Sequence, residues 1–154
     1  MKIYKIAANM QFIRGENAET LTQATGEAGT GYYFSPISNT KMVDYYTRDS
    51  KHVWLANAKV NCNIVDLTSN EHIEGIIEMI KLNTERMKND YEHYIVPKVN
   101  SGNYQRFPYA VEQYVDERLG NIDAYLIRHN AVSIPSGKQL VILNLDAFEL
   151  EQMK

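Results

Sequence analysis

The side chains best suited to hold a ligand lie in a short stretch rich in glycine and aromatic residues. It reads Gly29-Thr30-Gly31-Tyr32-Tyr33-Phe34-Ser35-Pro36. Three consecutive aromatic residues favour an extended strand, in which successive side chains point to opposite faces. We therefore expect Tyr33 to face one way and its two neighbours the other. The strand should end at Pro36, which has no amide hydrogen to donate.

A second aromatic pair, Tyr45-Tyr46, follows in a segment with helical spacing. Residues 38–48 carry Met42 and both tyrosines at positions typical of a helix. A strand followed by a short helix can bring Tyr33 and either Tyr45 or Tyr46 to opposite walls of one slot. Two phenol rings placed in this way suit a flat heteroaromatic ligand. A core strand with one solvent-facing tyrosine would give the same pattern, so both interpretations stay open at this point.

Composition limits the class of protein. The 154 residues fit one domain (1–154), and 44% hydrophobic and 23% charged residues are ordinary values for a globular chain. A net charge of −3 without any block of Lys or Arg argues against general binding to a nucleic-acid backbone. The single cysteine, Cys62, excludes an internal disulfide, and we expect it to be a small buried side chain. Because no apolar run could span a bilayer and no signal-peptide core follows Met1, we expect a cytoplasmic protein without a membrane partner.

The remaining pattern predicts the elements that must position these residues. We expect strands at 3–6, 32–34, 53–60, 63–67, 124–127 and 139–143, with 53–60 and 63–67 as one long strand or a bent pair. Helices are expected at 38–48, 70–89 and 109–119, the last ended by Gly120. Residues 15–26 should be loop-like or partly helical, 101–103 a polar loop, 133–137 a turn, and the end of the chain a short tail. Strands and helices do not alternate strictly, so we predict an α+β fold with a split, mainly antiparallel sheet and flanking helices.

Taken in order along the chain, these motifs resemble those of the ADP-ribosyltransferase superfamily, which includes bacterial mono-ADP-ribosylating toxins and poly(ADP-ribose) polymerases. Those chains open with a strand of the form Leu-Tyr-Arg-Gly or Trp-His-Gly. A Gly-x-Gly-x-Tyr-Phe strand and a helix ending in an Ala-x-x-Tyr type pair follow. The corresponding pieces here are Ile3-Tyr4-Lys5-Ile6, residues 29–36 and residues 42–45. Residues 58–67, 120–127 and 139–144 resemble the later strands of the family.

The resemblance implies an NAD site and a transferase reaction. Tyr33 and Tyr45 would sandwich the nicotinamide, and backbone groups near Ile6 and Ala7 would bind its carboxamide. Lys5 would take the His or Arg position and hold the ribose or a phosphate by charge-assisted hydrogen bonds. Gln139 stands where the family places its catalytic Glu. The resemblance also puts Tyr4, Gly31, Tyr32, Ser35 and Tyr46 around the NAD molecule.

Two of these positions depart from the family pattern. Lys5 can contact a phosphate, but it lacks the planar fork of Arg. Gln139 can orient a ribose hydroxyl, but it brings no negative charge. Breaking the nicotinamide–ribose bond builds positive charge on the ribose, which a carboxylate stabilises and an amide does not. The nearest acids in the sequence, Asp146, Glu149 and Glu151, lie beyond the last predicted strand.

Three hypotheses follow from the sequence. The first is an NAD-dependent mono-ADP-ribosyltransferase that modifies a protein, nucleic acid or small molecule, in a setting (toxin, phage effector or housekeeping protein) that the sequence leaves open. The second is a non-catalytic module of the same fold that binds NAD, ADP-ribose or a partner protein, and Gln139 favours it. The third is an interaction protein with a tyrosine-rich surface, in which Lys5 and Gln139 are solvated. The four histidines lack the spacing of metal ligands, so we predict no metal site.

Overall fold

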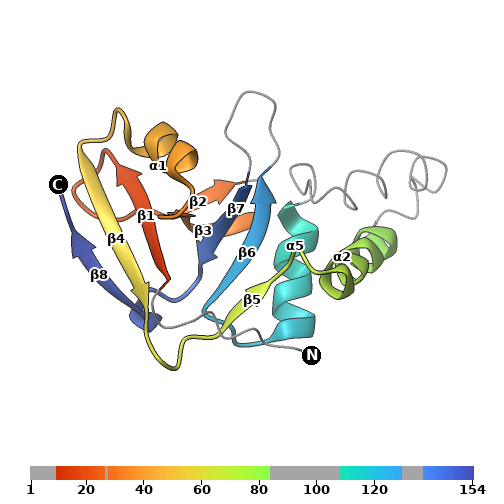
Figure 1. The fold of residues 1–154 in the computed structure, drawn as a ribbon. Coiled ribbons are helices and arrows are strands. Elements are labelled where there is room, and N and C mark those ends of the chain that lie inside the picture. The colour runs from red at the N-terminus through yellow and green to blue at the C-terminus, as the bar shows by residue number, and fades with distance from the viewer. Residues whose placement is uncertain (1–9, 27, 84–107, 130–136) are drawn as a thin grey trace.

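A single curled sheet organises the part of the chain that the structure describes, residues 10–26, 28–83, 108–129 and 137–154 of a computed structural model (Figure 1). Over these residues the sheet has eight strands in the order β5-β6-β7-β3-β1-β4-β8, with β2 paired to β3 off this path. Only β5 and β6 pair in parallel; the other pairs are antiparallel. The predicted α+β fold with a mainly antiparallel sheet is therefore confirmed. The strands are β1 (Gln11–Glu16), β2 (Ala24–Gly26), β3 (Gly29–Pro36), β4 (His52–Ala58), β5 (Ile64–Asp66), β6 (Ala124–His129), β7 (Gly137–Ile142) and β8 (Phe148–Gln152).

Sequence-encoded caps mark the start of the first described helix and the end of the helix before β6. They are α1 (Thr40–Thr47), α2 (Asn70–Asn83) and α5 (Pro108–Tyr114), and α5 continues as a π-helix over Val115–Leu119. The side chain of Asn39 caps α1 by accepting a hydrogen bond from the amide of Met42 at 3.1 Å. Gly120 ends the π-helix with a φ of 69°, which glycine adopts at little cost. The predicted helices are confirmed within the described residues, and none of the helices described there is both long and apolar enough to cross a membrane.

Apolar side chains are buried on both faces of the sheet. On one face, Val65, Tyr125 and Val141 pack against α2 and α5, forming what we call the helix-covered core. On the other face, the inner core draws on every strand from β5 to β8 along the sheet path, with Phe12 and Phe34 completely buried in it. Since all these strands contribute to one cluster, the sheet curls around the inner core (Figure 1).

The contact between β1 and β3 is short. Their register covers only Phe12 with Pro36 and Ile13 with Ser35, whereas β1 and β4 are paired from Gln11 to Glu16. The two strands therefore separate beyond Ile13 on β1 and before Ser35 on β3, in the middle of the sheet. The candidate site lies at this separation.

Three predicted elements were wrong in part. Residues 15–26 are not simply a loop, because β1 runs to Glu16 and β2 covers Ala24–Gly26. The segments 53–60 and 63–67 are not one strand, because β4 pairs with β1 and β8 while β5 pairs with β6. The expected tail contains β8, which pairs along β4 and buries Phe148. The predicted strand 3–6, the helix end 84–89, the loop 101–103 and the turn residues 133–136 lie outside the described residues.

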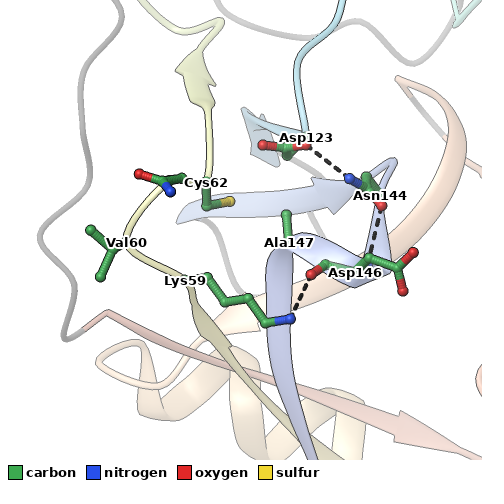
Figure 2. Close-up of a pocket in the computed structure, with 8 residues that line it drawn as sticks. Lys59, Val60, Cys62, Asp123, Asn144, Asp146 and Ala147 are labelled. Carbon is green, nitrogen blue, oxygen red and sulfur yellow. Dashed lines mark hydrogen bonds between the residues drawn. The ribbon is translucent and has the colours of Figure 1, made fainter.

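A pocket of about 460 Å³ lies where the β4–β5 connection meets the start of β6 and the end of β7 (Figure 2). Its wall includes Cys62, which is 8% exposed, as expected for a small buried side chain. Burial raises the pKa of the Cys62 thiol to about 12. The carboxylate of Asp123 accepts from the amide of Asn63 at 2.7 Å and from Nδ2 of Asn144 at 3.0 Å. We read this pocket as a hydrogen-bonded junction between loops with an unreactive thiol beside it.

Candidate functional site

Alternation along β3 separates its aromatic side chains. Tyr33 packs against the helix-covered core, whereas Tyr32 and Phe34 pack in the inner core. This confirms the orientation predicted for the three residues. The structure thus places Ser35 on the same face as Tyr33, and it does not bring Tyr32 to that face.

Ser35 and Gln139 form a polar pair within an apolar row of the sheet. Ser35 is paired with Ile13 of β1, which is itself paired with Leu55 of β4. Continuing the register of β3 with β7 by one residue past the Phe34–Leu140 pair puts Ser35 opposite Gln139, which is paired with Ile127 of β6. Both polar side chains are buried, with 2% of Ser35 and 6% of Gln139 exposed. The pair is thus flanked by Ile13 and Leu55 on one side and by Ile127 on the other, and polar groups in such an apolar row need hydrogen-bond partners.

The Gln139 side chain is 6% exposed, and none of the hydrogen bonds described for the structure involves it. Its amide atoms are not fully buried: the fully buried side-chain atom without a partner in the described residues is Trp54 Nε1. The Gln139 amide therefore stays within reach of a ligand or of water. Glutamine offers both an acceptor oxygen and a donor NH₂ group. Gln139 can therefore bind a ligand that carries a hydroxyl or an amide, and this burial separates it from the ordinary surface glutamine of our third hypothesis.

The ring of Tyr33 is fixed by the backbone of the β2–β3 turn. Its hydroxyl donates to the carbonyl of Gly29 at 2.6 Å and accepts from the amide of Ala28 at 3.2 Å. A Cβ atom added to Gly26 would lie 2.6 Å from Cζ of the ring, so this glycine backbone packs directly on the phenol. The half-buried ring is thus held in one orientation, which suits a stacking surface.

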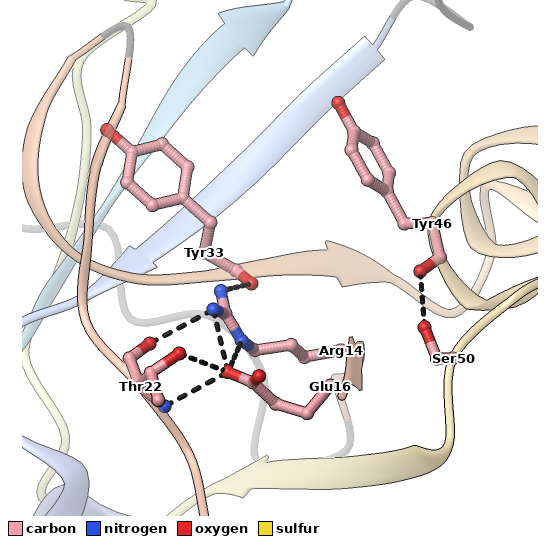
Figure 3. Close-up of polar contacts among 6 residues, drawn as sticks. All are labelled: Arg14, Glu16, Thr22, Tyr33, Tyr46 and Ser50. Atoms are coloured by element: carbon pink, nitrogen blue, oxygen red, sulfur yellow. Dashed lines mark hydrogen bonds and ion pairs between the residues drawn. The ribbon is translucent and has the colours of Figure 1, made fainter. Parts of the chain in front are cut away.

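Helix α1 carries the second aromatic pair. Met42 is completely buried, and Tyr46 follows it by one helical turn, so both lie on the same side of α1. Figure 3 shows the rings of Tyr33 and Tyr46 on the same side of the β3 ribbon. Tyr45 is 42% exposed and contacts Tyr46 edge-on, with 5.1 Å between ring centroids. Of the two predicted partners for Tyr33, Tyr46 is therefore the better placed.

Gly15 lets the end of α1 approach β1. A Cβ atom at this position would overlap the carbonyl oxygen of Tyr46 and the hydroxyl of Ser50. These two groups are themselves joined, since Ser50 Oγ donates to the Tyr46 carbonyl at 3.1 Å (Figure 3). The absence of a side chain at Gly15 thus sets the position of the helix that carries Tyr46.

A buried ion pair lies on the other side of β3, beneath Tyr33 (Figure 3). Arg14 donates from Nε and Nη2 to Oε1 of Glu16, at 3.0 and 2.9 Å, and from Nη1 to the carbonyl of Tyr33 at 2.8 Å. The Arg14 and Glu16 side chains are 13% and 8% exposed. Burial alone would raise the pKa of Glu16, but hydrogen bonds from Thr22 and from Arg14 lower it below its ordinary value. Glu16 is therefore ionised and balances the charge of Arg14.

The predicted site residues fall into three groups. Tyr33, Ser35, Tyr46 and Gln139 lie on the same face of the sheet or above it, as described. Gly31 is buried, and a Cβ there would lie 2.6 Å from Cγ1 of Val141, so it serves the packing of β3 on β7. The remaining predicted residues, Tyr4, Lys5, Ile6 and Ala7, lie outside the described residues.

Arg14 is the residue that we did not consider from the sequence. The predicted first strand was 3–6, but the strand beside β3 is β1. Its Phe12-Ile13-Arg14-Gly15 has the form Leu-Tyr-Arg-Gly more closely than Ile3-Tyr4-Lys5-Ile6 does. Applying that pattern to both segments would have identified Arg14.

Neither a metal centre nor a similarity to a known protein assigns a function to this site. No group of three or more His, Cys, Asp or Glu side chains in the described part of the chain could hold a metal ion. No family model matches the sequence, and neither a curated protein nor a solved structure matches the chain.

Proposed function

We propose that this protein is a mono-ADP-ribosyltransferase-like domain that binds NAD between Tyr33 and Tyr46, with the ribose of the nicotinamide half against Gln139. The observation that carries the proposal is the position of the polar Gln139 side chain, 6% exposed, on the same sheet face as the fixed ring of Tyr33. A nicotinamide ring suits the two tyrosines, and a ribose hydroxyl suits an amide. The motif order in the sequence supports the same ligand.

The proposal moves the family's cationic position from Lys5 to Arg14. Four hydrogen bonds engage Nε, Nη2 and one hydrogen of Nη1 on Arg14. A guanidinium has five N–H donors, so one donor of Arg14 remains for a ribose hydroxyl or a phosphate. By the same reasoning, the backbone of Gly15 replaces Ile6 and Ala7 as the group that binds the carboxamide.

In the reaction, the bond between ribose C1′ and the nicotinamide nitrogen breaks, and nicotinamide leaves with the electron pair. An acceptor nucleophile forms the new bond to C1′ and loses its proton. Tyr33 and Tyr46 hold the leaving group, and Gln139 orients the ribose. Because Gln139 is neutral, it leaves the developing positive charge unstabilised, so we expect slow, single transfers.

A second candidate is a module of the same fold that binds NAD or ADP-ribose without turnover. The observation that favours it is the set of residues beside Gln139 in its row across the sheet. From Leu55 of β4 through Ile13 and Ser35 to Ile127 of β6 these residues carry no carboxylate, and the row reaches its acid, Glu151, only on the edge strand β8, beyond Leu55. The nearby ionised acid, Glu16, already accepts hydrogen bonds from Arg14 and Thr22.

Nicotinamide release and mass spectrometry separate the two candidates. The purified chain is incubated with NAD and cell lysate, and free nicotinamide and species heavier by one ADP-ribose unit are measured. The transferase hypothesis expects both products, and the binding hypothesis expects calorimetric binding of NAD with neither. No binding and no product would contradict both.

Two variants test the site assignment. Tyr33→Ala should abolish NAD binding and nicotinamide release, whereas Tyr33→Phe keeps the ring and should retain most of both. Equal activity of the wild-type chain and Tyr33→Ala would refute the assignment. Gln139→Glu restores the family carboxylate and should preserve or raise release, so complete loss of release would mean that Gln139 has another role.

A further inference from the structure

The hydrogen bonds around Glu16 link the loop after β1 to the backbone under the proposed nicotinamide site. Four donors converge on Oε1 of Glu16: Nε and Nη2 of Arg14, and the amide and hydroxyl of Thr22, the last two at 3.0 and 2.7 Å. Nη2 of Arg14 also donates to the carbonyl of Thr22 at 3.0 Å. One carboxylate oxygen thus fixes both a side chain of β1 and a residue of the loop.

Arg14 takes the place of the missing backbone pairing between β1 and β3. The two strands separate beyond Ile13 and Ser35, and the next carbonyl of β3 on that side belongs to Tyr33. It accepts its hydrogen bond from Nη1 of Arg14 at 2.8 Å (Figure 3). The guanidinium therefore holds the backbone of Tyr33 where a strand would otherwise do so.

This arrangement requires the negative charge of Glu16. With 13% of its side chain exposed, Arg14 is largely removed from water, and an unpaired cation there would be costly. Without Glu16 the guanidinium would move toward solvent and release the carbonyl of Tyr33. The ring of Tyr33 is on the same residue, so its position depends on this pair.

The loop 17–23 is attached to the same Arg14–Glu16 pair. Residues 17–20 are exposed, while Leu21 packs at the edge of the inner core and Thr22 binds the ion pair. At its other end, Asn17 Oδ1 accepts a hydrogen bond from the amide of Lys51 at 3.2 Å. The middle of the segment 17–23 is thus held at Leu21 and Thr22, and the attachment at Thr22 consists of hydrogen bonds to the Arg14–Glu16 pair.

We propose that Glu16 is a positioning residue of the NAD site, which acts through Arg14 on the backbone of Tyr33 and through Thr22 on the loop 17–23. The inference rests on the proposed function, because it concerns the site that binds NAD. Glu16 touches no ligand in this scheme. Its role is to keep Tyr33, Arg14 and the loop in a single arrangement that is ready for the ligand.

The test compares NAD affinity and hydrogen exchange in the full chain. Glu16→Gln removes the charge at constant size, and a small misplacement of binding groups can cost about tenfold to a hundredfold. We expect NAD affinity to fall by about that factor, with faster exchange in peptides covering residues 17–23 and Tyr33. The control is Glu19→Gln, which removes an exposed acid from the same loop and should change neither measurement.

A second pair of variants guards against loss of folding. Thr22 is exposed, so Thr22→Val should fold, lose the hydroxyl donor, and weaken NAD binding, and Thr22→Ser should restore it. A merely structural role of the loop would not distinguish serine from valine in NAD affinity at equal thermal stability. If wild-type protein binds NAD and Glu16→Gln binds it equally well, the positioning role is overturned while the proposed function stands. If the wild-type chain binds no NAD, the proposed function itself fails, and the inference fails with it.

Discussion

Replacing Gln139 with Leu should stabilise the protein while removing its ligand affinity. Leu has a similar size and suits a row whose other neighbours include Ile13 and Ile127. The wild-type side chain is 6% exposed, but its amide atoms are not fully buried without a partner. The cost of placing this polar group in the apolar row therefore lies at the low end of about 1–3 kcal/mol. Gln139→Leu should remove that cost and raise the free energy of unfolding by about 1 kcal/mol.

The assay is urea unfolding at pH 7, with thermal melting as a second measurement. For a chain of this size, each kcal/mol corresponds to about 2–4 °C in Tm, so the melting temperature should rise by several degrees. Calorimetry with NAD should show at least tenfold weaker binding by Gln139→Leu. The matched control is Gln23→Leu, at an exposed glutamine, which should stay within about 0.5 kcal/mol of the wild-type chain.

The opposite sign would refute the reasoning. If Gln139→Leu is destabilised by 1 kcal/mol or more (about the net value of one hydrogen bond), Gln139 serves the fold and not a ligand. If Gln139→Leu is stabilised but binds NAD with unchanged affinity, the claim about the stability cost of the amide holds and the claim that NAD binds the amide fails.

Three further predictions concern other parts of the chain. Burial lowers the pKa of His72, whose Nδ1 lies 2.7 Å from the Tyr114 hydroxyl; the folded state thus binds fewer protons than the unfolded state, and stability should fall as the pH drops below 6.5. Urea unfolding from pH 7.5 to 5 should give a smaller loss for His72→Gln than for the wild-type chain, and equal slopes would contradict this. Gly15→Ala should cost about 1–3 kcal/mol in urea unfolding, because the added carbon overlaps the Tyr46 carbonyl; a change below about 0.5 kcal/mol would mean that α1 adjusts freely. Cys62, whose burial raises its pKa to about 12, should react with a thiol reagent at pH 8 only after unfolding, and rapid labelling of folded protein would refute its burial.

Elements with one dominant periodicity could be predicted from the sequence. The aromatic run of β3 and the apolar face of α2 each follow their period, so their type was predicted correctly, although β3 extends over Gly29–Pro36 beyond the predicted 32–34. In β1, Phe12 packs in the inner core while Ile13 is buried on the other face. With Arg14 and Glu16 also largely buried as a pair, the strand has no polar face and no alternation, which is why it was missed.

The candidate site could be predicted only where local sequence determines it. Tyr33 and Tyr46 come from one strand and the following helix, so nearby residues suffice to place both rings on one side of β3 (Figure 3). Gln139 lies in the row across the sheet because it stands beside Ser35 of β3 and Ile127 of β6. Its burial therefore depends on strands that are far apart in the sequence. Strand β8 has a local strand pattern, because Phe148 and Leu150 alternate with glutamates. The segment nevertheless forms a strand only because it can pair with the edge of β4, a partner distant in sequence.

The place of β7 in the sheet has a consequence for synthesis. Although it comes late in the chain, it lies between β6 and β3, and Tyr32 of β3 is paired with Ile142. Contacts of such sequence separation are slow to form, because the intervening chain must first be brought to a loop. A nascent chain that ends before Gly137 lacks a central strand and half of the Ser35–Gln139 pair. Ligand binding at this site therefore requires that translation has passed β7 and that the sheet has closed. Because the proposed NAD site needs β7, NAD should stabilise the full-length chain and not a chain truncated before Gly137.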